Sequence, residues 1–423
     1  MERLTQLIHD DMCPALGVTE PGAIAFSVAK AREHAQGGLL GIRVVLNSGM
    51  YKNAYTCGIP RSRLFGNAHA AALGYIAAVA ADGLECLSGV KPADSVKAEE
   101  LVREGKVRVE MGEVSSVISI VTTVETTEGT VCVRIRDAHT NIVSIEKNGV
   151  TVFEKAQPVR VEEEVKTPPI HDYTLRQLLN YVDRVDIAEL QFVRKAYELN
   201  LKLFEQALGS RRTAFAHHLY RKNGGRVIST DETLTASLLC NGAIEARVLG
   251  LSRPAMSITG SGAHGIIATL PLYAVREVNG LTEDALLRAT ALSFLVCMYI
   301  KEHSGRLSAF CGCAIAAGTG AACAIAYLKG GRYKELVLAI RNMASSVTGM
   351  ICDGGNHGCT MKGVVAVDAA FRSAAFALDG IAVESIHGIN GKTPEETMRN
   401  MGLVASPGMV GTEKVIVDIM RGK

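Results

Sequence analysis

The pattern of apolar and polar residues divides the first third of the chain into recognisable elements. Residues 19–35 and 67–81 are rich in Ala and other helix formers, and Thr19 and Pro21 suit a helix start. Residues 41–49 form a short run of β-branched and apolar residues. The pattern to residue 85 therefore predicts a helix, a strand, a loop and a second helix.

The pattern then changes to one typical of β-strands. Residues 107–154 are rich in Val, Ile and Thr with period-two alternation, and Glu128-Gly129 and Asn148-Gly149 lie where hairpin turns are expected. Residues 95–105 predict a helix in front of these strands, and the polar stretch 157–169 suits a linker. These features predict a small α+β domain over residues 88–168.

Helical patterns occupy nearly all of residues 174–380. Gly-rich breaks divide them at 222–225, 259–265, 302–305, 329–331 and 353–358. We therefore predict an α+β fold. A large, mostly α-helical domain, formed from residues 1–87 and 169–423, is interrupted by the small domain.

Composition narrows the class of protein. The chain has 423 residues, 48% hydrophobic and 21% charged, with a formal net charge of +2. This near-neutral balance argues against nucleic-acid binding and against adhesion to an acidic membrane. The 42 Gly residues and the absence of Trp indicate helices that approach one another closely.

Two features bear on location. Residues 311–328 contain 18 uncharged residues, but most are Ala, Gly, Cys and Thr, so we expect a buried helix and no membrane partner. The N-terminus lacks the basic start and apolar run of a signal peptide. We therefore expect a cytoplasmic protein, whose 11 cysteines are thiols or metal ligands and not disulfides.

Four cysteines form two short clusters beside Gly-rich backbone: Cys311 and Cys313, and Cys352 and Cys359. Thiolates suit zinc or iron–sulfur clusters, although these spacings are not the paired CxxC of structural zinc sites. An iron–sulfur cluster held by three cysteines leaves one iron open as a Lewis acid. The alternatives are a redox pair, a nucleophile, or Cys used as a small apolar side chain.

Two loops could bind a substrate. Gly260, Ser261, Gly262 and His264 precede a helix, where free backbone N–H groups can hold a small carboxylate; a tight turn between helices is the alternative. The loop of residues 47–60 carries polar groups on a rigid scaffold.

Several side chains could supply proton transfer. Lys52, Asn53 and Cys57 lie in the second loop, and His303 and His357 lie near the cysteine clusters. Lys52 could instead form an imine with pyridoxal phosphate, but no phosphate-binding cup accompanies it. A solvated lysine and structural histidines are the simpler alternatives.

Five segments together resemble the L-cysteine desulfidase family, which is related to the α subunit of iron–sulfur-dependent bacterial L-serine dehydratases. The segments follow the same order over residues 14–380: PALGVTEPGAIA, SGMYKNAYTCGIP, ITGSGAHGIIATLP, GRLSAFCGCAIAAGTGAA and TGMICDGGNHGCTMK. The resemblance implies a [4Fe-4S] lyase that eliminates sulfide from L-cysteine to give ammonia and pyruvate.

The resemblance also implies a set of site residues. Cys352 and Cys359 would be two cluster ligands, with Cys311 or Cys313 as the third. The substrate carboxylate would be held by Asn53, Lys52, Gly260, Ser261, Gly262 and His264. The candidates for the catalytic groups are Lys52, Cys57 and His303. The substrate would be a small amino acid, and we expect a homodimer.

This chain departs from the family pattern at two places. Val18 stands where the family usually has a cysteine regarded as a candidate base, and a valine cannot transfer protons. Ala263 and His264 stand where the family tends to have Asn and Gln. An L-serine dehydratase-like activity, or an amino-acid-binding paralogue without activity, are therefore the alternatives to cysteine desulfidation.

Overall fold

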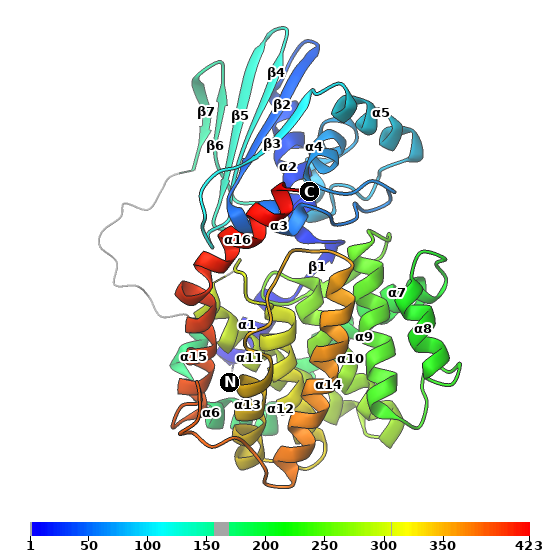
Figure 1. Ribbon diagram of the computed structural model, residues 1–423, viewed down its shortest axis with the longest axis vertical. Helices are drawn as coiled ribbons and strands as arrows, with labels where there is room; N and C mark the ends of the chain where they lie inside the picture. The colour runs from blue at the N-terminus through cyan, green and yellow to red at the C-terminus, as the bar shows by residue number, and fades with distance from the viewer. Residues whose placement is uncertain (1, 156–168, 306) are drawn as a thin grey trace.

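A computed structural model shows that the protein has a sheet-containing part and a larger helical part. In Figure 1 the sheet-containing part lies above the helical part. The structure describes residues 2–155, 169–305 and 307–423. The helical part holds most of the chain after residue 174, and the sheet combines one parallel pair with antiparallel pairs. The predicted α+β fold is confirmed.

The main sheet has six strands in the order β3-β2-β4-β5-β6-β7. Their bounds are β2 (Leu39–Leu46), β3 (Val107–Met111), β4 (Ser119–Thr126), β5 (Gly129–Arg136), β6 (Ile142–Lys147) and β7 (Val150–Glu154). Strand β2 comes from the first segment of the chain yet lies inside the sheet, parallel to β3 and antiparallel to β4. The domain boundaries stay a prediction, and nearly all of the predicted linker lies outside the described residues.

Both predicted hairpin turns are present. Strands β6 and β7 are joined by Asn148 and Gly149, whose φ angles are +53° and +78°. Positive φ at both central residues is what a tight hairpin turn requires, and Asn-Gly is the pair that adopts it most readily. Strands β4 and β5 pair up to Thr126 and Gly129, so Glu128 belongs to the connecting turn.

Three helices accompany the sheet: α2 (Thr19–His34), α4 (Asn67–Ile76) and α5 (Pro92–Arg103) (Figure 1). Helix α2 packs on β4, where the buried hydroxyls of Ser27 and Thr122 lie 2.6 Å apart. The predicted helix start was one residue late, because Val18 and not Thr19 is the N-cap. This shift matters because the start of α2 lies at the candidate site.

The helical part contains α1 (Glu2–Asp11), α6 (Leu175–Arg184), α7 (Arg194–Leu208), α8 (Ala214–Lys222), α9 (Glu232–Val248), α10 (Gly262–Asn279), α11 (Glu283–Ser304), α12 (Gly318–Leu328), α13 (Tyr333–Val347), α14 (Gly358–Leu378) and α15 (Pro394–Leu403). Each predicted Gly-rich break lies at the end of a helix, although residues 262–265 belong to the first turn of α10 and residues 302–304 to the last turn of α11. Sequence reasoning missed the pairing of β1 (Cys13–Leu16) with β8 (Pro254–Ser257), and part of the loop predicted at residues 47–60 is instead a helix, α3 (Ser48–Ala54). No helix in the described residues is long and apolar enough to cross a membrane.

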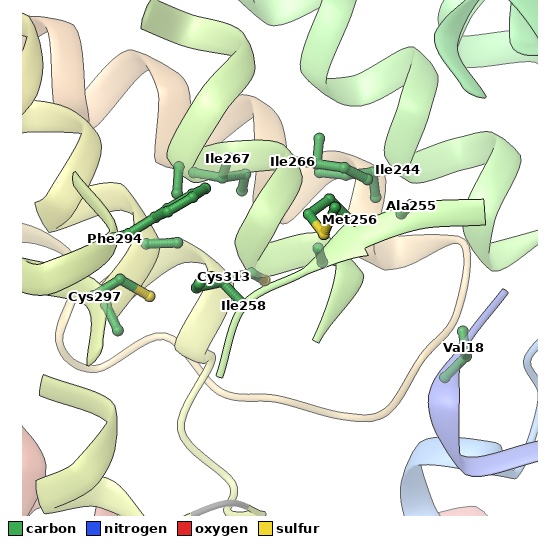
Figure 2. Packing of buried hydrophobic residues seen from close by; sticks show 14 of the residues in the cluster. Val18, Ile244, Ala255, Met256, Ile258, Ile266, Ile267, Phe294, Cys297 and Cys313 are labelled. Atoms are coloured by element: carbon green, nitrogen blue, oxygen red, sulfur yellow. The ribbon is translucent and has the colours of Figure 1, made fainter. Parts of the chain in front are cut away.

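Small residues let the core helices approach closely. A Cβ atom on Gly320 of α12 would lie 2.3 Å from the backbone oxygen of Ser293 on α11. Figure 2 shows Phe294 of α11 packed with Ile267 of α10 in this core, with Cys297 one turn further along α11. The high Gly and Ala content therefore has a direct packing reason.

The C-terminal helix α16 (Val410–Arg421) lies against α3 (Ser48–Ala54) through a buried ion pair. Lys52 Nζ lies 2.7 Å from Glu413 Oε2, with side-chain exposures of 0% and 6%, and it also donates to Ser308 O at 2.9 Å. Figure 1 shows α16 running from the helical part to α3 beside the sheet. This pair therefore connects the end of the chain to the first segment.

We expect Gly320→Ala to destabilise the protein by about 1–3 kcal/mol, because the added methyl group meets backbone that cannot move aside. The control is Gly318→Ala in the same helix. The nearest neighbour of its Cβ would be the flexible end of Met343, at 3.2 Å, and the next atoms are at ordinary contact distance. Chemical denaturation of both variants checks this, and equal midpoints would contradict the packing explanation.

We expect Lys52→Met to destabilise by about 3–5 kcal/mol, because it leaves Glu413 buried and unpaired. The double variant Lys52→Met/Glu413→Leu should recover much of that loss, since no buried charge then remains. Lys414→Met, which removes an exposed pair with Asp418 on the same helix, is the control and should change little. Thermal unfolding measures all three, and a double variant as unstable as the single would refute the pairing role.

Candidate active site

A pocket of about 100 Å³ lies where segments of the sheet part and the helical part meet. Residues from the start of α2, from α3, from the loop after β5 and from helices α9 to α11 line this pocket. The remaining walls are residues 307–313 and the cysteine loop that leads into α14. A site of this size admits a small molecule and little else.

Backbone pairing brings the two cysteine clusters together. The amide of Cys311 donates to Met350 O at 3.0 Å, and that of Cys352 donates to Ala309 O at 2.6 Å. As a result Cys311, Cys313, Cys352 and Cys359 all line the same pocket. The Cys311 and Cys313 sulfurs lie 3.3 Å apart.

Glycines let the cysteine loop pack tightly. A Cβ on Gly354, whose φ is +105°, would lie 2.4 Å from Lys52 O. A Cβ on Gly355 would lie 2.8 Å from Val18 Cγ1. The loop is thus pressed against α3 and against the residue that replaces the cysteine of the resembled family.

The thiols of Cys352 and Cys359 are partly buried and lie near the cation of Lys362. Burial raises the pKa of Cys359 to about 12, and the nearby Cys352 and Cys311 add to the rise. Burial also raises the pKa of Cys352, against the opposing effect of Lys52. Burial lowers the pKa of Lys362, but its bond with Asp353 and the thiols of Cys359 and Cys352 raise it overall. Lys362 therefore stays charged and can stabilise thiolates.

This donor set fits an iron–sulfur cluster better than a single metal ion. Within residues 2–155, 169–305 and 307–423, no three His, Cys, Asp or Glu side chains converge as ligands of one ion. A cluster spreads its cysteine ligands over several irons and needs no such convergence. Soft thiols gathered in one small pocket match that chemistry.

The pocket contains some predicted site residues and not others. Asn53, Gly260, Ser261 and His264 line it. Gly262 lies behind this lining, where a Cβ would be 2.7 Å from Arg247 Nε.

Lys52, Cys57 and His303 do not line the pocket, and their catalytic roles stay predictions. Lys52 is held by Glu413. Cys57 is fully buried and donates to Ala54 O at 3.5 Å. His303 stacks on His171 with ring centroids 3.7 Å apart, and burial and His171 lower its pKa to about 4.

The pocket also contains charged side chains that sequence reasoning missed. Arg247 is 5% exposed, and its Nε has no hydrogen-bond partner among the described residues. Glu20, also 5% exposed, accepts bonds from Asn53 Nδ2 at 2.8 Å and Thr19 Oγ1 at 3.0 Å. A buried arginine without a hydrogen bond at Nε can bind an anion. For Arg247 the signal in the sequence was a charge near the end of a mostly apolar helix pattern, and Glu20 lies within the first of the five segments that carry the family resemblance.

His264 is held in its neutral form. Its Nδ1 lies 2.5 Å from Thr259 Oγ1, and a Cβ on Gly312 would lie 2.6 Å from its Nε2. Burial, Lys301 and Arg247 lower its pKa well below the usual value. The pocket thus places an uncharged imidazole beside the Cys311–Cys313 segment.

Comparison with known proteins identifies relatives of the whole chain. A UPF0597 protein of Clostridium botulinum (strain Langeland) is 40% identical over 423 residues, covering 99% of this chain and 98% of the relative. UPF0597 proteins of Desulfotalea psychrophila and Caldanaerobacter subterraneus are 36% and 34% identical, each covering 99% of this chain and 98% of the relative. None of these descriptions names an L-cysteine desulfidase. The sequence pattern described as the serine dehydratase alpha chain matches residues 81–418, so the chain belongs to the serine dehydratase alpha chain family.

Proposed function

We propose that this protein is a β-eliminating lyase that acts on a small α-amino acid with the help of a [4Fe-4S] cluster. The observation that carries the proposal is the meeting of four thiols, a buried arginine and a buried carboxylate in one small pocket. The family description favours L-serine as substrate, and the resemblance of the five motifs favours L-cysteine. Both substrates carry a leaving group on Cβ.

Cys352, Cys359 and one of Cys311 and Cys313 would hold the cluster. With three thiolate ligands, such a cluster supplies an open iron that acts as a Lewis acid toward the β-hydroxyl or β-thiol. Lys362 offsets the negative charge of the thiolates. The glycines of the cysteine loop allow its backbone to lie close to the site.

The charged lining suits an amino-acid zwitterion. Arg247 can hold the carboxylate, with the backbone of Gly260 and Ser261 as further lining at the same wall. Glu20 can accept a hydrogen bond from the ammonium group. Binding both charges fixes the substrate's orientation, because each interaction alone would leave it free to rotate.

His264 is our candidate for the group that removes the Cα proton. A general base must be unprotonated, and the lowered pKa of His264 keeps it so at neutral pH. Its contact with Thr259 fixes the ring. Val18, Leu307 and Phe310 supply apolar walls that limit the access of water.

The homodimer expected from the sequence stays a prediction.

The function is tested by anaerobic reconstitution with iron and sulfide, followed by assays of pyruvate formation from L-serine and L-cysteine. We expect bound iron and inorganic sulfide, and pyruvate from at least one substrate. The variant Val18→Cys separates the active enzyme from the paralogue without activity. Pyruvate formed only by that variant would show that the natural chain has lost activity, and a chain that binds no iron would refute the cluster.

We expect Cys352→Ser and Cys359→Ser each to lower the iron content and abolish pyruvate formation, because each removes a soft ligand. Of Cys311→Ser and Cys313→Ser, only one should have this effect, which identifies the third ligand. Cys132→Ser, in strand β5 and outside the pocket, is the control and should keep its iron. Visible absorbance and iron analysis measure the result, and full iron in the Cys352 and Cys359 variants would exclude them as ligands.

We expect Arg247→Met to lower kcat/KM by about 10- to 100-fold, mainly through KM, because a charge-assisted contact with the substrate is worth about 1.5–3 kcal/mol. Folding should be little affected, since Arg247 Nε makes no hydrogen bond to lose. Arg253→Met, on the exposed loop that follows α9, is the control. Steady-state kinetics checks this, and an unchanged KM would rule out a role in carboxylate binding.

A further inference from the structure

A second cavity, of about 400 Å³, lies beside the C-terminal end of α9. It shares no lining residue with the first pocket, the one that contains the four cysteines and is called the cysteine pocket below. Three arginines line it: Arg61, Arg63 and Arg212. Its other lining residues are Ser, Gln, Pro, Gly and Leu, with no Asp or Glu among them. The cavity therefore concentrates positive charge.

The three arginines are not paired with carboxylates. No ion pair involves any of them in the part of the chain that the structure describes. Arg212 donates to the backbone oxygen of Leu249 at 2.8 Å. Burial and the nearby Arg63 lower the pKa of Arg212, so two like charges lie close enough to repel. All three side chains are exposed, so an anion can reach them from solvent and would offset this repulsion.

The backbone holds Arg61 in an unfavourable conformation. Residues 59–62 form a turn in which Ser62 N donates to Ile59 O at 3.1 Å, with Pro60 and Arg61 at its centre. Arg61 has a φ of +58°, in the left-handed region. Turns with Pro followed by positive φ normally place Gly or Asn there. Strained residues of this kind cluster at binding sites.

Neutral donors complete the cavity. The hydroxyls of Ser62 and Ser95 lie 3.1 Å apart, and both residues line it. Pro92, the first residue of α5, also lines it, but proline has no backbone N–H and Asp94 already caps this helix start, so recognition rests on the side chains.

We propose that this cavity binds the phosphate group of a small molecule. Arginine presents several N–H donors in a planar fork that matches phosphate oxygens, and the serine hydroxyls add to that recognition. The cavity is larger than inorganic phosphate requires, so it has room for a phosphate ester.

The cavity adjoins the segment that follows Arg247 of the cysteine pocket. Arg61 N donates to Gly250 O at 3.2 Å, and a Cβ on Gly250 would lie 2.6 Å from the backbone carbon of Ile59. A phosphate held by Arg61 and Arg212 would thus rest on the backbone just after α9. The inference does not depend on the proposed lyase activity.

Isothermal titration calorimetry of the full chain, with ionic strength held constant by KCl, tests the inference. The probes are inorganic phosphate, AMP and adenosine. We expect saturable binding of phosphate or AMP and none of adenosine. Tighter binding of AMP than of phosphate assigns the cavity to a phosphate ester, and binding of phosphate alone assigns it to the free anion. Absence of saturable binding of both would overturn the proposal.

Matched variants test the location of the site. Arg63→Ala and Arg212→Ala should each weaken binding at least tenfold. Arg211→Ala removes an adjacent exposed arginine that does not line the cavity, and it should bind as the natural chain does. Circular dichroism verifies that all three are folded. Equal affinity in the Arg212 and Arg211 variants would show that any binding lies elsewhere.

Discussion

The backbone hydrogen bonds between residues 309–311 and 350–352 are the constraint on which the candidate site depends. They hold together two segments that lie some forty residues apart and that each carry cysteines. Helices α12 and α13 occupy the intervening chain and pack in the same core. The packing of these rigid helices therefore fixes where residues 309–311 and 350–352 meet. The positions of the four thiols follow from that meeting point.

Buried charges give the pocket its chemical character. Arg247, Glu20 and Lys301 are each 5% exposed, and all three line the same small space. Buried charges are costly unless they are paired or perform a task. Lys52 shows the paired case, since Glu413 and Ser308 O bind its ammonium group. Arg247 is the case of a buried charge with a task. Its Nε has no hydrogen-bond partner among the described residues, and we therefore assign it to binding a ligand.

The two arginine sites have a common backbone element. Helix α9 carries Arg247 in its last turn, and the residues directly after it form one wall of the second cavity. Close backbone contacts at Gly58 and Gly250 hold this wall to the loop that carries Arg61 and Arg63. The same packing therefore positions a side chain in one pocket and the charged loop of the other.

The sequence by itself determined the local structure and the cysteine pattern. Alternation of apolar residues predicted strands β2 to β7, and Gly-rich breaks predicted the ends of the helices, because these signals depend on neighbouring residues alone. Only the tertiary structure decided which distant side chains share a pocket. Packing placed Arg247 and Glu20 with the thiols and left Lys52, Cys57 and His303 outside the pocket lining. A sequence pattern shows which way a residue faces within its own element, but contact across the fold depends on how the elements pack.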